Sequence, residues 1–277
     1  MKELSPRRKR ILRGESKHKL ATRLALIKTW EAEGFNVRGV ARELEFQVTN
    51  FEQQGACNTV FVTSLSPTRI RRQLTCLRTW EKFGVTIKAL QSAAEIEELS
   101  RLFPAVEFIE TSDLIGKHVR VRRLAAEAKD QPVIVLNADL ELYGPQAAFL
   151  EDWDRPGFHL GIRWNYTQIS HCIQEEWGVD ALLIQPNMVE SLQDDELGAL
   201  GLPGWDWGVP KLLELRGFEQ SISNAPQFFH QKHHQTWTRE QSLKAQSAYC
   251  DQFGFTIPDM QECVRRGRQG GEARVAV

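Results

Sequence analysis

The stretch Pro132-Val-Ile-Val-Leu-Asn-Ala-Asp-Leu-Glu-Leu142 decides the fold. Its four consecutive apolar residues, 133–136, are typical of a β-strand that is buried on both faces. Two polar residues, Asn137 and Asp139, follow where such a strand should end. A buried carboxylate is costly unless it is paired or bound to a metal, so we expect Asp139 to meet a cation or a hydrogen-bond donor. A turn aspartate with satisfied hydrogen bonds is the plain alternative.

The sequence before this strand alternates between strand and helix patterns. We expect strands at 59–63, 85–89 and 106–109, and helices at 68–83, 93–103 and 119–128. Repeated strand–helix–strand units with short connections predict an α/β fold, with a largely parallel sheet covered by helices on both faces. The second half is less regular. There we expect strands at 158–164 and 180–185, loops rich in Trp, Gly and Pro, a helix at 238–249, and a frayed tail after Val264.

Length and composition describe an ordinary soluble globular protein. The chain has 277 residues, of which 42% are hydrophobic and 26% charged, so it can bury a sizeable core. No apolar run approaches the ~20 residues of a membrane span, and the charged start lacks a secretory signal. The five cysteines are scattered without a C-x-x-C spacing, so we expect neither a disulfide framework nor a structural zinc site, and a reducing cytoplasmic location.

The N-terminal region differs in charge from the rest of the chain. Residues 1–23 hold nine Lys or Arg and two Glu, whereas the whole chain has a formal net charge of −1. A helical pattern, a turn near Gly34 and a second short pattern resemble part of a helix-turn-helix. The recognition helix would fall near 47–53, where helical periodicity is poor. We therefore expect a basic helical extension over 1–57, which either reads DNA or is merely solvated.

Two further stretches contain residue types that suit a binding site. Thr63-Ser64 follows the first strand and leads into a helix, so it can either bind a nucleotide phosphate or simply cap the helix. No G-x-G-x-x-G or P-loop motif is present. In Gly201-Leu-Pro-Gly-Trp-Asp-Trp-Gly-Val-Pro210, the rings of Trp205 and Trp207 can stack on a sugar, and apolar surroundings raise the pKa of Asp206 towards that of a base.

A histidine cluster follows about twenty residues later. Phe228-Phe-His-Gln-Lys-His-His234 places three histidines within five positions beside aromatic residues. This pattern suggests ligation of a metal or a phosphate, and a surface cluster without a ligand is the alternative.

Together these motifs resemble a GT-A fold glycosyltransferase, of the nucleotide-diphospho-sugar transferase superfamily. The Thr-Ser strand end, a helical Gly116-Lys-His-Val-Arg120 segment and the Asn-Ala-Asp strand end resemble its nucleotide half. The segments Gly178-Val-Asp-Ala-Leu-Leu183, 201–210 and Phe229-His-Gln-Lys-His-His-Gln-Thr-Trp237 resemble its acceptor half. The resemblance implies a mixed sheet flanked by helices over 58–250, with a C-terminal tail over 251–277.

The resemblance also implies an activity and a role for each residue. The chain would be a hexosyltransferase-type enzyme that moves a sugar from a nucleotide-diphosphate donor, which in this family is usually a UDP-sugar, held by Mn²⁺ or Mg²⁺. The metal ligands would be Asp139 and His230, with His233 as second choice. The donor would meet Thr63, Ser64, Lys117, Arg120, Asn137 and Asp139, and the acceptor would meet Trp205 and Trp207. Asp206 would be the catalytic base, and Asn137 departs from the family's Asp-x-Asp motif.

Two hypotheses remain open on the sequence. In the first, the chain is this glycosyltransferase, and its acceptor hydroxyl could belong to a hydroxymethylated base in DNA, a glycan, a lipid-linked molecule or a protein. In the second, it binds nucleic acid through its basic N-terminus and the cluster Arg69, Arg71, Arg72 and Arg78, on a non-catalytic scaffold. A charged, solvated helix face is the alternative explanation of that cluster.

Overall fold

The computed structural model describes most of the chain beyond the N-terminal region. It covers residues 59–142, 156–161, 163–166, 172–174, 179–221, 228–231 and 237–272. The extension expected over 1–57, with its helix-turn-helix pattern, lies outside these ranges, as does His233. Within them, no helix combines the length and the apolar character that a membrane crossing requires.

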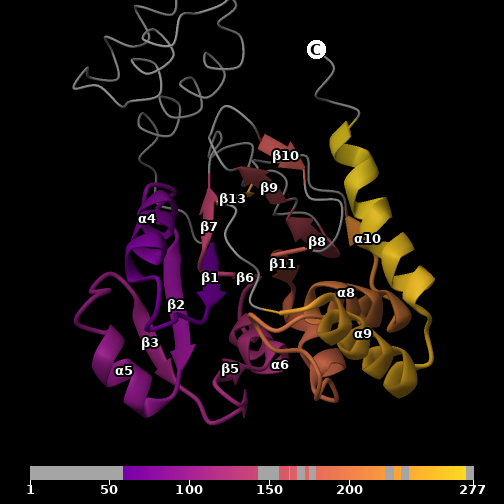
Figure 1. The fold of residues 1–277 in the computed structure, drawn as a ribbon, viewed down its shortest axis with the longest axis horizontal. Coiled ribbons are helices and arrows are strands. Elements are labelled where there is room, and N and C mark those ends of the chain that lie inside the picture. The colour runs from indigo at the N-terminus through magenta and orange to yellow at the C-terminus, as the bar shows by residue number, and fades with distance from the viewer. Residues whose placement is uncertain are drawn as a thin grey trace, which may run out of the picture.

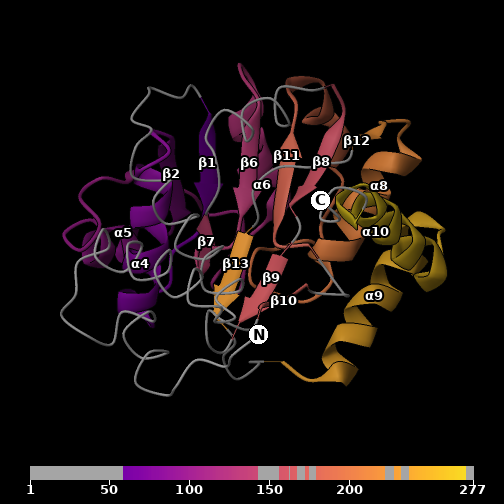
Figure 2. The same cartoon turned by 90° about the horizontal axis from the view of Figure 1, so that it is seen from above.

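A seven-stranded mixed sheet forms the centre of the fold (Figures 1 and 2). Its order is β12 (Gln220–Ser221), β8 (Phe158–Gly161), β11 (Ala181–Ile184), β6 (Val133–Leu136), β1 (Val60–Thr63), β2 (Thr86–Gln91) and β3 (Glu107–Glu110). Strands β6, β1, β2 and β3 run parallel, whereas β11 is antiparallel to both β6 and β8. The sheet therefore changes polarity beside β6.

A smaller four-stranded sheet lies against the first. Its order is β10 (Cys172–Gln174), β9 (Arg163–Tyr166), β13 (Phe228–Gln231) and β7 (Leu140–Leu142). Strand β7 starts four residues after β6 ends, and β9 starts two residues after β8 ends. Both connections pass from the large sheet to the small one, so the two sheets meet where β6 and β8 end.

The alternating burial of β6 explains why the strand is apolar throughout. Val133 and Val135 pack into one core with helices α6 (Val121–Ala125), α8 (Trp205–Leu215) and α10 (Ile257–Glu272). Ile134 and Leu136 pack into the other, with α4 (Ile70–Glu81) and β7. All four side chains have 0% exposure. The expected α/β fold, a mixed sheet flanked by helices, is therefore confirmed.

Helix α4 is fastened to both sheets through Trp80. Its indole ring meets Phe61 of β1 edge-on, with ring centroids 5.3 Å apart, and its Nε1–H donates to the carbonyl of Leu140 at 2.8 Å. Helix α5 (Ala93–Leu99) follows β2 and begins with a capping box between Ser92 and Glu95. The hydrogen bond from Trp80 to Leu140 places the start of β7 beside α4.

Two segments in the first half of the described chain differ from the sequence-based expectations. The stretch 116–120, expected to be helical, contains a hairpin of β4 (Leu114–Ile115) and β5 (His118–Val119). Gly116 forms its turn with φ 61°, a conformation that glycine adopts without a steric penalty. The single strand expected at 158–164 is divided into β8 and β9, which belong to different sheets.

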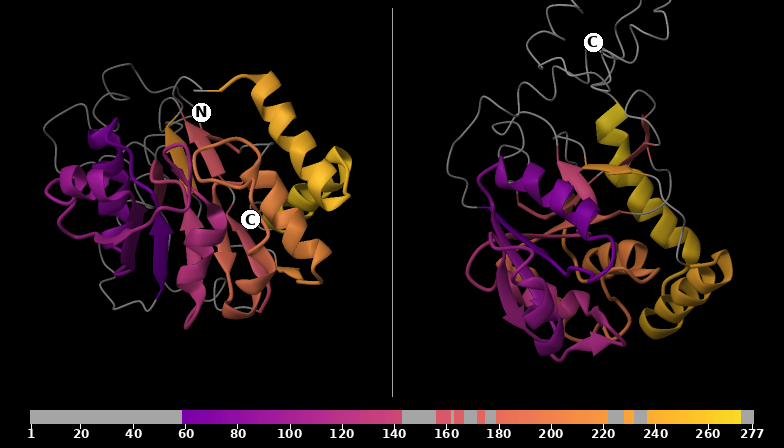
Figure 3. Two further views of the ribbon diagram at one scale, coloured as in Figure 1. Left: turned by 90° about the horizontal axis from the view of Figure 1, so that it is seen from below. Right: turned by 60° about the vertical axis from the view of Figure 1, so that its left-hand side comes forward.

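The C-terminal part is more helical than expected. The Trp-Asp-Trp stretch, expected to be a loop, begins α8, because burial of Trp205, Trp207 and Leu212 outweighs the proline inside the helix. Pro210 has no N–H, so it removes only the hydrogen bond to the carbonyl of Asp206. The residues after Val264, expected to be a frayed tail, continue α10 to Glu272, and Met260, Cys263 and Val264 earlier in this helix belong to the core. Figure 3 shows α9 (Arg239–Phe253) and α10, in yellow tones, beside the orange α8.

Glycine at position 208 makes room for Tyr249 of α9. A Cβ at this position would lie 2.5 Å from three ring atoms of Tyr249. We predict that Gly208→Ala lowers the free energy of unfolding by roughly 1–3 kcal/mol, the usual cost of overpacking, although Gly-to-Ala within a helix normally stabilises. Urea denaturation measures the change.

The matched control is the same substitution in a Tyr249→Leu background, where the ring is gone. There Gly208→Ala should be neutral or stabilising. Equal destabilisation in both backgrounds would show that the ring contact is not the cause.

Candidate active site

Strand polarity brings polar residues from three strand ends to one edge of the large sheet. Leu136, the last residue of β6, pairs with Ala181, the first residue of β11. Ala181 also pairs with Gly161, the last residue of β8. The residues just beyond these ends, Asn137 and Asp180, therefore lie together. In open α/β sheets, ligands bind beyond the carboxyl ends of the parallel strands, which here include β1 and β6.

Asp180 is the centre of a first row of polar side chains. Its Oδ1 accepts a hydrogen bond from Nδ2 of Asn137 at 2.7 Å, and its Oδ2 forms an ion pair with Nη1 of Arg163. The side chains of Arg163 and Asp180 are 20% and 10% exposed. Largely withdrawn from water, the carboxylate is held by a cation on one oxygen and an amide on the other.

Asp139 and His230 form a second row with Asn165. Oδ2 of Asp139 lies 3.2 Å from Nε2 of His230, and Nδ1 of His230 lies 2.9 Å from Oδ1 of Asn165. On β13, His230 is the register partner of Asn165 on β9 and of Leu140 on β7. Leu140 directly follows Asp139 in the sequence, so the pairing brings His230 next to Asp139. The structure thus brings together two residues that lie 91 positions apart in the chain.

The chemistry of the second row suits a divalent cation. In the tautomer that donates Nδ1–H to Oδ1 of Asn165, Nε2 of His230 presents its lone pair to the carboxylate of Asp139. Two electron-rich atoms at this distance need a proton or a metal ion between them. Neighbouring ligands of an octahedral ion, each about 2.1–2.2 Å from it, are separated by about 3 Å. The observed spacing of 3.2 Å fits that geometry.

Two ligands are fewer than a closed metal site requires. Among the described residues there is no group of three or more His, Cys, Asp and Glu that could hold a metal ion. An open pair of protein ligands is what a cation shared with substrate phosphates needs, because Mg²⁺ and similar ions keep several positions for phosphate and water.

Arg72 fixes the segment that carries Asp139. Its Nη2 donates to the main-chain carbonyl of Asp139 at 3.2 Å, and its Nη1 forms an ion pair with Glu141. The other arginines of the predicted cluster, Arg69, Arg71 and Arg78, are exposed, whereas the side chain of Arg72 is only 15% exposed. Arg72 therefore supports the site rather than forming part of a solvated helix face.

Asp206 lies in the first turn of α8, and its pKa is raised to about 7. Burial is the main cause, and the negative charge of Asp180 adds to it, whereas Arg163 and the N–H of Gly204 act in the opposite direction. That N–H donates to Oδ1 of Asp206 at 3.2 Å. A carboxyl group with a pKa near neutrality can take up a proton from a hydroxyl group during a reaction.

Of the other predicted donor residues, Thr63 and Ser64 are engaged in the protein's own hydrogen bonds, whereas Lys117 is exposed. Thr63 is fully buried, and its hydroxyl donates to the carbonyl of Leu136 at 2.7 Å, joining the ends of β1 and β6. The hydroxyl of Ser64 donates to Oε1 of Gln91 at 2.6 Å. Lys117 is exposed in the turn between β4 and β5. Of these three, only the Lys117 ammonium group is open to a donor.

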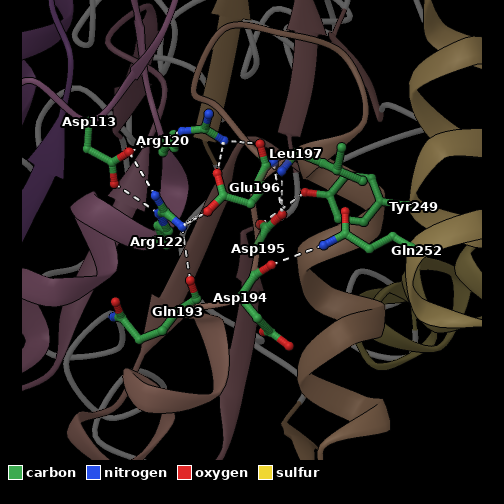
Figure 4. A network of polar contacts seen from close by, with 11 residues as sticks. Asp113, Arg120, Arg122, Gln193, Asp194, Asp195, Glu196, Leu197, Tyr249 and Gln252 are labelled. Carbon is green, nitrogen blue, oxygen red and sulfur yellow. Dashed lines mark hydrogen bonds and ion pairs between the residues drawn. The ribbon is translucent and has the colours of Figure 1, made fainter.

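Arg120 lies in an ion-pair network at the start of α6 (Figure 4). Its Nε is 3.1 Å from Asp113 and its Nη1 is 3.0 Å from Glu196, and Arg122 contacts the same two carboxylates. Asp195 lies beside this network. Its Oδ2 accepts a hydrogen bond from the hydroxyl of Tyr249 at 3.1 Å. The charge of Arg120 is therefore already balanced before a donor arrives.

Trp205 and Trp207 are 2% and 6% exposed and belong to the core. Little of either indole ring is open to an acceptor sugar in this conformation, so their burial does not support the predicted stacking role. Their evident contribution is to anchor the first turn of α8, which carries Asp206.

Sequence reasoning missed three residues of the site: Asp180, Arg163 and Asn165. Asp180 was part of a recognised segment, but nothing in it indicated an ion pair. Arg163 and Asn165 lie two positions apart on β9, the spacing at which side chains point to the same face of a strand. That spacing could have indicated a shared face for the two side chains. A single strand expected at 158–164 includes Arg163 but ends before Asn165, so it does not group them.

Comparison with known proteins identifies no family. No protein-family model matches the sequence, and no curated protein matches it either. Solved structures are similar at low identity. The mannosyltransferase PcManGT from Pyrobaculum calidifontis, in complex with GDP-Man and Mn²⁺, is 11% identical with a TM-score of 0.43, covering 89% of this chain and 80% of that one.

Two other solved structures are similar to a comparable degree. The inositol-1-phosphate CTP transferase from T. maritima is 10% identical with a TM-score of 0.42, covering 72% of this chain and 98% of that one. GalNAc-T7 with UDP, GalNAc and Mn²⁺ is 10% identical with a TM-score of 0.46, covering 78% of this chain and 55% of that one. All three similarities have TM-scores below 0.5.

The raised pKa of Asp206 predicts a pH-dependent penalty on stability. Between about pH 4 and about pH 7 the folded state holds a proton that the unfolded state has lost, so stability falls as the pH rises through this window. Asp206→Asn removes the titration. The variant should therefore gain stability relative to the wild type from pH 4 to pH 7, by on the order of 4 kcal/mol, with a constant difference above.

Urea denaturation at several pH values measures this difference. Asp251→Asn, at an exposed aspartate of α9, serves as the control and should show no such trend. A pH-independent difference between wild type and Asp206→Asn would mean that Asp206 ionises as an ordinary carboxylate.

Proposed function

We propose that this chain is a metal-dependent glycosyltransferase that moves a sugar from a nucleotide-diphosphate donor, in the first place a UDP-sugar, to an acceptor hydroxyl. The observation that carries the proposal is the contact between Asp139 and His230 at the carboxyl end of β6, with the far nitrogen of His230 held by Asn165. An open carboxylate–imidazole pair beyond a parallel strand suits a cation that also binds two phosphates.

Asp139 and His230 would hold Mn²⁺ or Mg²⁺ at this place. When bound, the cation neutralises negative charge on the departing nucleoside diphosphate. Asn165 keeps the imidazole in one orientation, and Arg72 keeps the Asp139 main chain in place. Lys117 is the exposed cation that can approach the donor from the β4–β5 turn.

Asp206 would act on the acceptor. The oxygen of the acceptor hydroxyl forms the new bond to the anomeric carbon of the sugar, while the bond from that carbon to the diphosphate breaks. The hydroxyl proton passes to the carboxylate of Asp206, whose pKa of about 7 matches a general base at neutral pH. The diphosphate leaves with the electron pair of the broken bond.

The site geometry favours this enzyme over a non-catalytic nucleic-acid-binding scaffold. A scaffold that only binds DNA has no use for a carboxylate facing an imidazole, nor for a partly buried Asp206 with a raised pKa. The raised pKa of Asp206 costs stability at neutral pH, and such perturbed groups are typical of functional sites.

We further propose DNA as the acceptor class, on the evidence of charge. Residues 1–23 hold nine Lys or Arg against two Glu. Such a segment provides salt-sensitive affinity for a phosphate backbone. The reacting hydroxyl would belong to a hydroxymethylated base that is extruded or single-stranded, because a base inside the duplex stack is out of reach.

Removal of either proposed ligand should weaken metal-dependent donor binding. We predict that Asp139→Ala and His230→Ala each lower the affinity for Mn²⁺ plus UDP by at least about 10-fold, because each removes one of two protein ligands. Calorimetry with UDP, with and without Mn²⁺, tests this. Asp130→Ala is the control, since Asp130 is an exposed aspartate shortly before the amino end of β6. Folded variants with wild-type affinity would remove this pair from the site.

Deletion of residues 1–23 tests the acceptor class separately. Affinity for single-stranded DNA should fall, and the log–log slope of affinity against salt should decrease by ~0.7 for each lost phosphate contact. Fluorescence anisotropy with a labelled oligonucleotide measures both. Binding of UDP with Mn²⁺ is the internal control and should not change. An unaltered salt slope would contradict DNA as acceptor and leave the transferase proposal standing.

A further inference from the structure

The hydrogen bond between Asn137 and Asp180 has a fixed direction. The ionised carboxylate of Asp180 can only accept, so the amide of Asn137 must turn its Nδ2 towards it, at 2.7 Å from Oδ1. The amide oxygen of Asn137 then points away from Asp180. The other oxygen of Asp180 is taken by Arg163. The order of groups along this row is therefore guanidinium, carboxylate, amide.

This order accounts for an amide at position 137. An aspartate there would place a second carboxylate at hydrogen-bond distance from Asp180, and like charges at that distance repel strongly. The two positions therefore carry one negative charge in total, and this charge is on Asp180. Position 137 is where the resemblance to the GT-A family leads one to expect an acidic residue.

We propose that Asp180 supplies, from the start of β11, the negative charge that the donor site lacks at Asn137, and that it is a positioning residue for Asn137. This inference rests on the proposed function. Asp180 attracts the cation from a distance and turns the amide oxygen of Asn137 away from itself, so that this oxygen is available to the donor or to a metal-bound water. Asp180 itself is not a metal ligand.

The chain positions of the two polar rows support a role near the metal. Asn137 and Asp139 are two residues apart beyond β6, and Arg163 and Asn165 are two residues apart on β9. Two residues of extended chain, as on β9, span about 7 Å, and the turn that holds Asn137 and Asp139 places those two no further apart. The row around Asp180 therefore runs next to the row around His230. At this separation, the poorly solvated charge of Asp180 would affect a cation held by Asp139 and His230.

An exchange of the two side chains tests the inference. In the double variant Asn137→Asp/Asp180→Asn, the amide oxygen at 180 can accept from Arg163, and its NH₂ can donate to the carboxylate at 137. Every partner is kept, and only the position of the charge changes. Asp180→Asn alone removes the charge, and Asn137→Asp alone sets two carboxylates against each other.

The readouts are the dissociation constant for Mn²⁺, from electron paramagnetic resonance of the free ion, and the thermal midpoint. We expect Asp180→Asn to weaken Mn²⁺ binding about 10-fold, as is usual for groups that support ligands, and the exchange to restore most of that affinity. Asn137→Asp should lower the thermal midpoint, and the exchange should restore it as well. Asp251→Asn, an exposed aspartate on α9, is the matched control for loss of one charge.

A merely structural role would give a different pattern. If Asp180→Asn and the exchange change the thermal midpoint but not the affinity for Mn²⁺, the inference is overturned. If Asp180→Asn does not fold, the exchange variant decides alone: Mn²⁺ affinity more than about 10-fold below wild type overturns the inference. Asp139→Ala is measured in parallel. Loss of Mn²⁺ binding there, without an effect of Asp180→Asn, overturns only this inference, whereas no effect of Asp139→Ala overturns the proposed function with it.

Discussion

The change of strand polarity beside β6 is the constraint on which the site depends. On one side β6 pairs with the parallel β1, and on the other with the antiparallel β11. In a purely parallel sheet, the start of each strand lies at the opposite edge from the end of its neighbour. Here the start of β11 lies beside the end of β6, so Asp180 meets Asn137 directly. The two polar rows follow from that register, because the chain passes from the large sheet to the small one at the same edge twice, from β6 to β7 and from β8 to β9.

Polar groups can be concentrated at this edge because both cores beneath it are apolar. Each face of β6 is covered completely, and Trp80 and Tyr249 fill the space between helices and sheets. Most polar side chains near the edge are held by partners that accept or donate with defined geometry. The site is therefore set in a rigid frame, which suits an arrangement of ligands that must be in place before a substrate binds.

Much of the fold could be predicted from sequence, because burial on both faces leaves a simple pattern. The apolar run 133–136 and the strand–helix alternation before it gave the α/β class and the parallel strands. The pairing of Asp139 with His230 agrees with the predicted ligand pair, although their role in binding metal stays a prediction. The α8 helix was missed because local propensity disfavours Gly and Pro, whereas burial of Trp205 and Trp207 decides the conformation. Asp180 and Arg163 were missed because an ion pair between distant segments leaves no local pattern.

The distance along the chain between the members of the second polar row has a consequence for biosynthesis. Asp139 meets a histidine 91 residues further on, and Asn165 reaches the same ring from 65 residues before it. A ribosome must therefore translate β13 before either contact can form. Until then, the proposed metal ion would lack one of its two protein ligands, and it could not stabilise the growing chain. The large sheet has to reach its mixed topology on hydrophobic burial alone, and such long-range pairing is slow. Binding at the proposed site would therefore stabilise the chain only after β13 has been translated.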